Sequence, residues 1–393
     1  MKKILAVTYG GGHVNIIRAL YKEMQKSSDI EFVILALTMA AKVLDHEQIP
    51  HLTISEVACQ LDSYEKILEY GKKAADENHN PDSGIKYEDA VAYFGIGYLD
   101  LVKQYGAKQA AVLFEKEGRK AFLPVESMKE ILQLIKPDAL LITTSPRMEK
   151  AAGIAGSQMN IPVVKVADLP IVSRVDYPCK LCVMNEWSKD YVVNQEHMVA
   201  ENVVVTGQPV FEENLVVDKD IEDGYRKNLK RNYDKVITYL GQPQNPDTEM
   251  TIQILLEYAR NNPNQMIIIR PHPNDDSIDC LNSENVLVTK EGELKYIIAI
   301  SDLLITHYST AGLEGALMGK PLVTVLVNSV NEVRYSQLGI AVEVNSFQDL
   351  KPAIYSCLQN SKIQEQLRNG LECFKNKEHA AHNIIKVILQ VMK

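Results

Sequence analysis

Hydrophobic residues along the chain fall into two alternating patterns. Short continuous apolar runs, rich in valine, isoleucine and leucine, have the length of fully buried strands. These runs lie at residues 3–8, 32–36, 51–54, 139–143, 162–166, 180–184, 203–205, 236–240, 266–269, 286–288, 303–306 and 322–325. Between many of them, apolar residues recur at steps of three and four, as on the buried face of a helix. The alternation predicts an α/β fold with parallel sheets covered by helices.

Residues 60–136 depart from this alternation. Within residues 87–105, apolar and aromatic side chains recur at steps of four and three, which predicts one long amphipathic helix with an aromatic stripe. Packing in a core is the usual role of such a stripe. The polar stretch DENHNPDSG at residues 76–84 predicts a loop before this helix. We therefore expect a helical insert at about residues 60–136 of the first domain.

The length of 393 residues indicates two domains rather than one. Gly207 and Pro209 mark the expected boundary, because this pair of residues interrupts both helices and strands. The predicted domains are residues 1–208 and 209–375, followed by a C-terminal helix in residues 376–393.

Composition and charge narrow the class of protein. A hydrophobic content of 46% with 24% charged residues is typical of a soluble globular protein. No apolar run reaches the roughly 20 residues of a membrane span, and the first residues lack a signal-peptide pattern. We expect a cytoplasmic protein, either free or attached to the inner face of the membrane. The net charge of −9 argues against nonspecific binding to nucleic acid.

The six cysteines suggest neither a disulfide framework nor a metal site. Cys179 and Cys182 form the only C-x-x-C pair, without a second pair or a histidine at zinc spacing. Reduced thiols and the absence of a bound metal are therefore expected.

A strand-helix-strand unit at residues 301–325 carries the first candidate site. Ser309 is a good N-cap for the helix, and Thr310 adds a second hydroxyl at its start. The start of a helix after a parallel strand attracts an anion such as a phosphate. Glu314, one turn further on, could accept hydrogen bonds from a ribose. The alternative is that Ser309 only caps the helix and Glu314 is a solvated residue of its first turn.

A cationic motif, RPHPN at residues 270–274, follows the strand at residues 266–269. Arg270 offers a planar fork of donors that matches a phosphate, and His272 is held between two prolines. Gly241 and Gln242 follow a strand in the same way, and His307 precedes Ser309. We predict that these residues form a donor-binding site at one edge of the second sheet.

A glycine loop at Gly10, Gly11 and Gly12 separates the first strand from the first helix. Such a loop lets a ligand approach the backbone closely, but Asn15 occupies the third glycine position of a dinucleotide fingerprint, which argues against NAD. His13, next in the chain, is a candidate general base because neutral histidine has a suitable pKa. The alternatives are a helix-capping role and binding of the acceptor without taking its proton. Asp168, after another strand, is the rival base, and its own alternative is a buried structural aspartate.

The RPHPN motif, a strand, and then THYSTAGLEGALMGKPLV at residues 306–323 resemble the donor-binding half of GT-B glycosyltransferases and their relatives. The relatives include bacterial capsule, sialyl and glycerophosphate transferases with a His-Pro motif, and the UDP-N-acetylglucosamine 2-epimerases. The resemblance implies two Rossmann-like domains that face a cleft, with the acceptor on the first and the nucleotide donor on the second. It also implies a crossover at residues 206–211, a C-terminal helix that returns to the first domain, and an insert that could line the acceptor pocket.

The expected function is therefore a nucleotide-sugar-dependent glycosyltransferase of surface polysaccharide or glycoconjugate synthesis, acting on a sugar or lipid-linked acceptor. No cofactor or metal is expected, since cations and helix starts can neutralise the leaving group. Leu322, eight residues after Glu314, stands where retaining families carry a second glutamate, which favours inversion.

Two other functions stay open. An epimerase of the UDP-N-acetylglucosamine type is the first, although its glycine-threonine-arginine-proline-glutamate loop is replaced here by residues 9–12. Its histidine- and arginine-rich loop is likewise replaced by residues 241–245. A noncatalytic protein that binds a nucleotide sugar is the second.

Overall fold

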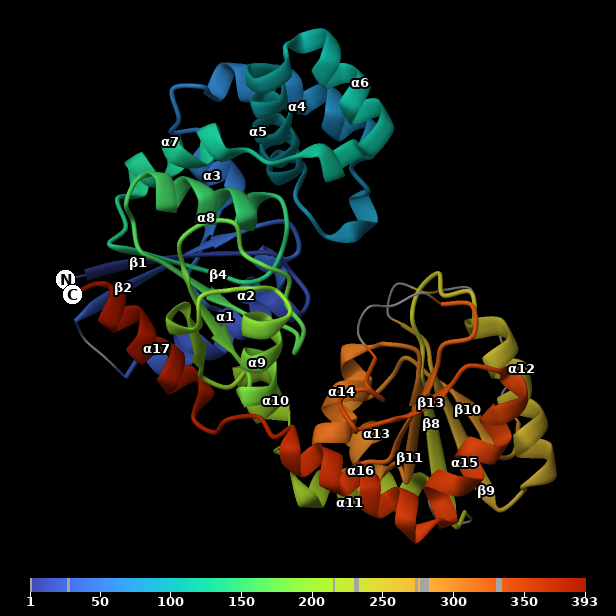
Figure 1. Cartoon of the computed structure of the whole chain (residues 1–393). Helices are drawn as coiled ribbons and strands as arrows, with labels where there is room; N and C mark the ends of the chain where they lie inside the picture. Colours follow the sequence, from blue (N-terminus) through green and yellow to red (C-terminus); the bar gives the residue numbers. More distant parts are fainter. Residues whose placement is uncertain are drawn as a thin grey trace. The chain divides into compact units, whose positions relative to one another are not determined.

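Apolar runs form the strands of two separate sheets in the computed structural model of the chain (Figure 1). The structure describes residues 2–26, 29–214, 216–229, 233–272, 275, 283–329 and 334–393. Its contacts divide the chain into a first unit, Met1–Val210 with Lys377–Lys393, and a second unit, Phe211–Asn376.

The first unit is built on a seven-stranded parallel sheet in the order β3-β2-β1-β4-β5-β6-β7. Its strands are β1 (Lys2–Thr8), β2 (Ile30–Ala36), β3 (Leu52–Thr53), β4 (Ala139–Ile142), β5 (Val163–Val166), β6 (Lys180–Val183) and β7 (Val203–Val205). The central strands are apolar on both faces because helices cover both sides, as in other parallel sheets. In the register, Ile4 pairs with Phe32 on one side and with Ala139 on the other.

The helices of the first unit are α1 (Gly12–Met24), α2 (Ala40–His46), α3 (Ile54–Ala58), α4 (Tyr64–Asn78), α5 (Tyr87–Tyr105), α6 (Ala107–Glu117), α7 (Val125–Ile135), α8 (Met148–Gln158), α9 (Glu186–Asn194), α10 (Pro209–Asn214, which runs across the boundary between the units) and α17 (Ala380–Val391). Helix α17 packs beside α1, and its Ile384 and Ile388 are buried with Val14 and Ile17 (Figure 1). The C-terminal helix thus completes the core of the first unit.

Helices α3 to α7 follow β3 and precede β4 in the sequence, and they form the helical insert (Figure 1). Helix α5 has the predicted bounds, and Phe94 within it packs edge-to-face against Phe114 and Phe122. Tyr87 and Tyr105, at the two ends of α5, are exposed. The middle of the aromatic stripe therefore forms the core of the insert.

The second unit contains a six-stranded parallel sheet in the order β10-β9-β8-β11-β12-β13. Its strands are β8 (Lys235–Leu240), β9 (Gln265–Arg270), β10 (Val286–Val288), β11 (Leu303–Thr306), β12 (Leu322–Val325) and β13 (Val342–Val344). Its helices are α11 (Lys219–Leu229), α12 (Thr248–Asn261), α13 (Leu294–Ile300), α14 (Thr310–Leu317), α15 (Leu350–Gln359) and α16 (Ser361–Cys373). The prediction of two parallel-sheet α/β domains with a helical insert in the first is confirmed.

No helix in the part of the chain that the structure describes is long and apolar enough to cross a membrane.

Candidate functional site

The second unit gathers three predicted donor-binding segments at the carboxyl edge of its sheet. Strands β9, β8 and β11 are neighbours there, and each is followed by one segment. An added Cβ at Gly241, after β8, would be 3.2 Å from the carbonyl oxygen of Arg270, the last residue of β9. The side-chain oxygen of Gln242 accepts a hydrogen bond of 2.7 Å from the N–H of Tyr308, after β11. The three segments therefore lie side by side, as the carboxyl ends of neighbouring parallel strands must.

The start of α14 provides the backbone N–H groups that an anion needs. The hydroxyl of Ser309 accepts a hydrogen bond from the N–H of Ala311 at 3.2 Å, while Thr310 is exposed and Glu314 is half-buried. The hydroxyl of Tyr335 donates to the carbonyl oxygen of Ser309 at 3.1 Å and so holds the turn before the helix. Ser309 thus has its predicted place at the N-cap, and Thr310 is open to a ligand.

His307 is fully buried in the second unit. Its Nδ1 lies 2.8 Å from the carbonyl oxygen of Val325, and its Nε2 lies 2.8 Å from the hydroxyl of Tyr239. Burial lowers the pKa of His307, although the hydrogen bond to Val325 opposes this effect. The neutral ring donates to the carbonyl and accepts from the tyrosine, so it connects β11 to β12 and β8. The prediction that His307 contacts the donor is therefore wrong, because both ring nitrogens are used inside the core.

Arg270 supports a neighbouring loop. Its guanidinium donates to the carbonyl oxygens of Gly292 at 2.9 Å and Thr289 at 3.4 Å, and also to that of Glu291. Burial lowers the pKa of Arg270. These bonds position residues 289–292, and the binding of a phosphate by Arg270 stays a prediction.

His272 lies two residues after the end of β9 in the second unit. It is half-buried, and its carbonyl oxygen accepts the N–H of Asp275 at 2.8 Å. The remaining part of the predicted motif, residues 273 and 274, lies outside the described residues.

Asp247, which the sequence analysis did not single out, organises the loop after β12. Its fully buried carboxylate accepts backbone N–H groups from Val327, Asn328 and Ser329 at 2.9–3.1 Å, and the hydroxyl of Ser329 at 2.7 Å. Burial acts to raise the pKa of Asp247, but these hydrogen bonds outweigh it and lower the pKa below its usual value. An aspartate just before a predicted helix was the available signal.

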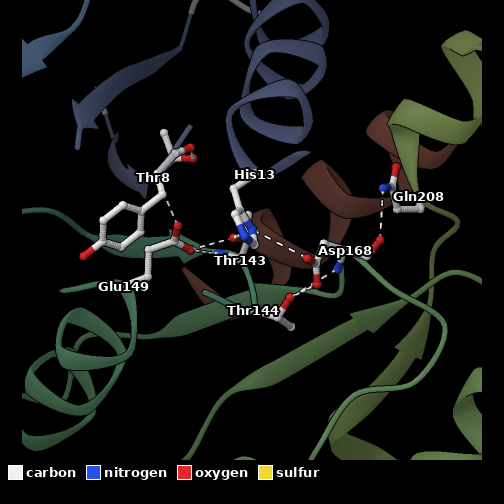
Figure 2. Close-up of polar contacts among 8 residues, drawn as sticks. Thr8, His13, Thr143, Thr144, Glu149, Asp168 and Gln208 are labelled. Atoms are coloured by element: carbon white, nitrogen blue, oxygen red, sulfur yellow. Dashed lines mark hydrogen bonds and ion pairs between the residues drawn. The ribbon is translucent and has the colours of Figure 1, made fainter. Parts of the chain in front are cut away.

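In the first unit, His13 lies at the start of α1, at the carboxyl edge of β1 and β4 (Figure 2). Its Nδ1 is 2.7 Å from the hydroxyl oxygen of Thr143 and 3.8 Å from a carboxylate oxygen of Asp168. The hydroxyl of Thr144 donates to the same carboxylate, and the side-chain N–H of Gln208 lies 3.5 Å from the carbonyl oxygen of Asp168. The two rival bases of the sequence analysis are thus neighbours.

Glu149 is a fully buried carboxylate that lies next to Thr143 on the side away from Asp168 (Figure 2). It accepts the N–H of Tyr9 at 2.9 Å, the N–H of Thr143 at 2.7 Å and the hydroxyl of Thr143 at 2.6 Å. Burial raises the pKa of Glu149, and the charge of His13 and these hydrogen bonds oppose the rise.

The hydrogen-bond chain from Glu149 defines the tautomer of His13. Three donors surround the Glu149 carboxyl, which suits the ionised form. The single hydroxyl hydrogen of Thr143 is then directed at Glu149, so Thr143 must accept from the Nδ1–H of His13. The Nε2 of His13 is left with its lone pair. Thr143 and Glu149 were not predicted, because only the tertiary structure brings them to His13.

The glycine loop beside His13 has no side chains that would cover its backbone. Gly10 packs closely, since an added Cβ would lie 2.7 Å from the Cβ of Met39. Gly11 has a φ of 70°, which favours glycine, and an added Cβ at Gly11 or Gly12 would meet no described atom within 4 Å. The last two glycines thus keep the backbone at the start of α1 open to a ligand.

A pocket of about 420 Å³ opens beside His13 in the first unit. We call it the His13 pocket. The loop after β4, the first turn of α8, strand β5 and the loop between β5 and β6 line it. The polar and charged residues among its lining are His13, Thr144, Ser145, Lys150, Lys165, Asp168, Ser173, Arg174, Asp176 and Tyr177.

Residues 156–337 match the sequence model of the CDP-glycerol:poly(glycerophosphate) glycerophosphotransferase family. The matched range begins in α8, includes Asp168, and continues through β8 to β12 and the turns that follow them. No curated protein sequence matches the chain at a significant level.

Solved structures with similar folds span the whole chain. The UDP-GlcNAc 2-epimerase of Neisseria meningitidis bound to UDP-GlcNAc is 16% identical with a TM-score of 0.65, over 99% of this chain and 100% of that chain. The MnaA–UDP structure from S. aureus is 14% identical with a TM-score of 0.65, over 100% and 98% of the two chains. The glycosyltransferase SnogD of Streptomyces nogalater is 13% identical with a TM-score of 0.59, over 99% and 100%. The chain therefore has the GT-B fold that its motifs predicted.

Proposed function

We propose that the protein is a transferase that moves a glycerophosphate group from CDP-glycerol to a hydroxyl of an acceptor. The match of residues 156–337 to the glycerophosphotransferase family carries this proposal. That range contains the three segments at the carboxyl edge of the second sheet, where nucleotides bind in open α/β folds. The GT-B fold agrees with the use of a nucleotide-activated donor.

The second unit would hold the donor. The N–H groups at the start of α14, with the hydroxyls of Ser309 and Thr310, would bind the diphosphate, and His272 would donate a further hydrogen bond. Glu314 would accept the ribose hydroxyls. These donors would also stabilise the negative charge that moves onto the departing nucleotide.

The first unit would supply the base. The Nε2 of His13 would take the proton of the acceptor hydroxyl, whose oxygen forms a bond to the terminal phosphorus of the donor. The bond from that phosphorus to the oxygen that bridges the two phosphates breaks, and CMP leaves with the electron pair. The glycerophosphate group is then attached to the acceptor oxygen. Asp168, 3.8 Å from the Nδ1 of His13, would stabilise the imidazolium. Thr143 and Glu149 would keep the ring in the required tautomer.

The test is the release of CMP by the purified full-length protein from CDP-glycerol with a glycerophosphate oligomer as acceptor. We expect CMP to appear only with acceptor present, and His13→Ala to lower kcat about 10²–10⁴-fold. UDP-GlcNAc without acceptor is the parallel assay, since an epimerase needs no acceptor. Turnover of UDP-GlcNAc alone, with none of CDP-glycerol, would refute the proposal.

The assay also separates a noncatalytic nucleotide-binding role. Such a protein would bind CDP-glycerol, and would lose that binding with His272→Ala, but would release no CMP with any acceptor.

A further inference from the structure

Within the described part of the chain, the His13 pocket is lined by three cationic side chains, Lys150, Lys165 and Arg174, and by only two carboxylates. Lys150 lies in the first turn of α8, Lys165 on β5, and Arg174 in the loop between β5 and β6. None of these three side chains forms an ion pair or a side-chain hydrogen bond with any residue that the structure describes. Their carboxylate neighbours in the pocket are Asp168 and Asp176, and Asp168 already accepts from Thr144. The pocket therefore has unused positive charge.

Lys165 occupies an unusual position for a lysine. Its neighbours on β5, Val164 and Val166, are buried in the core beside α1. Lys165 lies on the opposite face, half-buried, with its Nζ 5.9 Å from the ring centre of Tyr177. Burial lowers the pKa of Lys165 and the charge of Lys150 acts in the same direction, while Cys179, Glu149 and Asp168 oppose them without reversing the shift. A desolvated ammonium group is costly without a partner, so an anion beside it would be stabilised.

A lysine that only packs its stem on Tyr177 is the simpler explanation for Lys165 alone. Two observations are not explained by packing of the lysine stem alone. Lys150 comes from a different element and lies close enough to affect Lys165. The first turn of α8 also adds the positive end of a helix dipole to the same pocket. Cations on separate elements thus surround one cavity that also contains His13.

We propose that Lys165 and Lys150 bind an oxyanion of the acceptor, a phosphate or carboxylate group, and thereby place a hydroxyl of the same molecule beside His13. The inference rests on the proposed function for the role of His13, but not for the anion site itself. The acceptor would then be an acidic molecule with a free hydroxyl. Arg174, exposed at the rim, would attract the anion rather than hold it.

The test measures binding of sn-glycerol 3-phosphate to the full-length protein by calorimetry at constant ionic strength. Saturating CDP keeps the phosphate away from the second unit. We expect Lys165→Met and Lys150→Met each to weaken binding about tenfold or more, because a charge-assisted hydrogen bond is lost. Lys165→Arg should retain binding. Lys26→Met is the matched control, since Lys26 is 73% exposed at the end of α1 and should have no effect.

Neutral glycerol and glucuronate complete the experiment. Glycerol should not bind measurably, and comparison of glucuronate with glycerol 3-phosphate identifies which oxyanion the pocket prefers. Equal binding by the wild type, Lys165→Met and Lys150→Met would overturn the inference. So would binding that disappears in His272→Ala but not in Lys165→Met.

The outcome is separable from the proposed function. If CDP binds and the lysine variants change nothing, only the acceptor inference fails. If CDP does not bind, the donor proposal fails, and the titration repeated without CDP still tests the two lysines.

Discussion

At the residue scale, Thr143 links two other side chains of the candidate site. It connects a fully buried carboxylate to the ring of His13 through one hydroxyl group. The hydroxyl can donate only once, so its contact with Glu149 determines what it can offer His13. This makes Thr143 a positioning residue for the proposed base.

Thr143→Val should lower kcat about tenfold to hundredfold, less than the loss expected for His13→Ala. The donor KM should stay unchanged, because Thr143 lies in the first unit. Thr143→Ser should restore most of the rate, since it restores the hydroxyl. A Ser variant as slow as the Val variant would show that the methyl group, rather than the hydrogen bond, matters.

Glu149 should make stability depend on pH. Burial raises the folded-state pKa of Glu149 above its usual value of 4.5. The folded protein then binds this proton more tightly, so the contribution is fully present below pH 4.5 and is lost as the pH rises through the folded pKa. The unfolding free energy of wild type minus that of Glu149→Gln should therefore fall as the pH rises from 4.5.

The slope of that difference should reach at most about 1.4 kcal/mol per pH unit. Urea unfolding can be followed by the fluorescence of Trp187, the only tryptophan, which lies in the first unit. Glu115→Gln, on the exposed face of α6, serves as the control. A difference that rises with pH would contradict the raised pKa.

At the scale of elements, α4 and α5 approach each other through glycines. An added Cβ at Gly95 would lie 2.1 Å from the carbonyl oxygen of Ile67, and one at Gly71 would lie 2.1 Å from that of Val91. Glycine in a helix is normally unfavourable, but here it allows two backbones to pack closely.

Gly95→Ala should therefore destabilise the first unit by about 1–3 kcal/mol, because the helices must separate. Gly224→Ala is the matched control: Gly224 lies in the exposed α11 with no described atom within 4 Å of an added Cβ. That change should be neutral or stabilise the second unit by about 0.5–1 kcal/mol. Urea unfolding measures both, and equal effects would refute the packing argument.

A second element, the loop after β12, depends on Asp247. Asp247→Asn should reduce the unfolding free energy of the second unit by about 1–3 kcal/mol, since an amide cannot accept all the N–H groups that the carboxylate accepts. The pKa of Asp247 is lowered in the folded state. The stability that wild type has over the variant should therefore be fully present above the usual pKa of 3.8, and it should be lost as the pH falls through the folded-state pKa. Equal stability of wild type and variant at pH 7 would contradict this role.

At the scale of the whole molecule, each unit has its own sheet and its own hydrophobic cores. Units with separate cores can unfold separately. CDP at about one hundred times its Kd should stabilise the second unit by about 2.7 kcal/mol and raise its calorimetric Tm by roughly 5–11 °C. The unfolding curve of the first unit, followed by the fluorescence of Trp187, should stay unchanged. If the calorimetric transition and the fluorescence transition shifted by the same amount, the two units would unfold together.

Local patterns in the sequence were sufficient for most of the strands and for their order along the chain, although β13 was not among the predicted strands. Strands β1, β8, β9, β11 and β12 lie close to the apolar runs, because a strand covered on both faces must be apolar throughout. The grouping of Gly241, Gln242 and the turn before α14 also followed from sequence, since polar residues just after parallel strands must share one edge.

Side-chain direction and long-range contacts were decided only by the tertiary structure. His307 turned into the core and Arg270 toward residues 289–292, although both lie at the ends of strands. Glu149 meets His13 across 136 residues of chain, and Lys150 and Lys165 share a pocket because α8 packs on β4 and β5. The sequence by itself determined where polar groups emerge from the sheets. Which of them stay open to a ligand depends on neighbours that only the packed chain brings together.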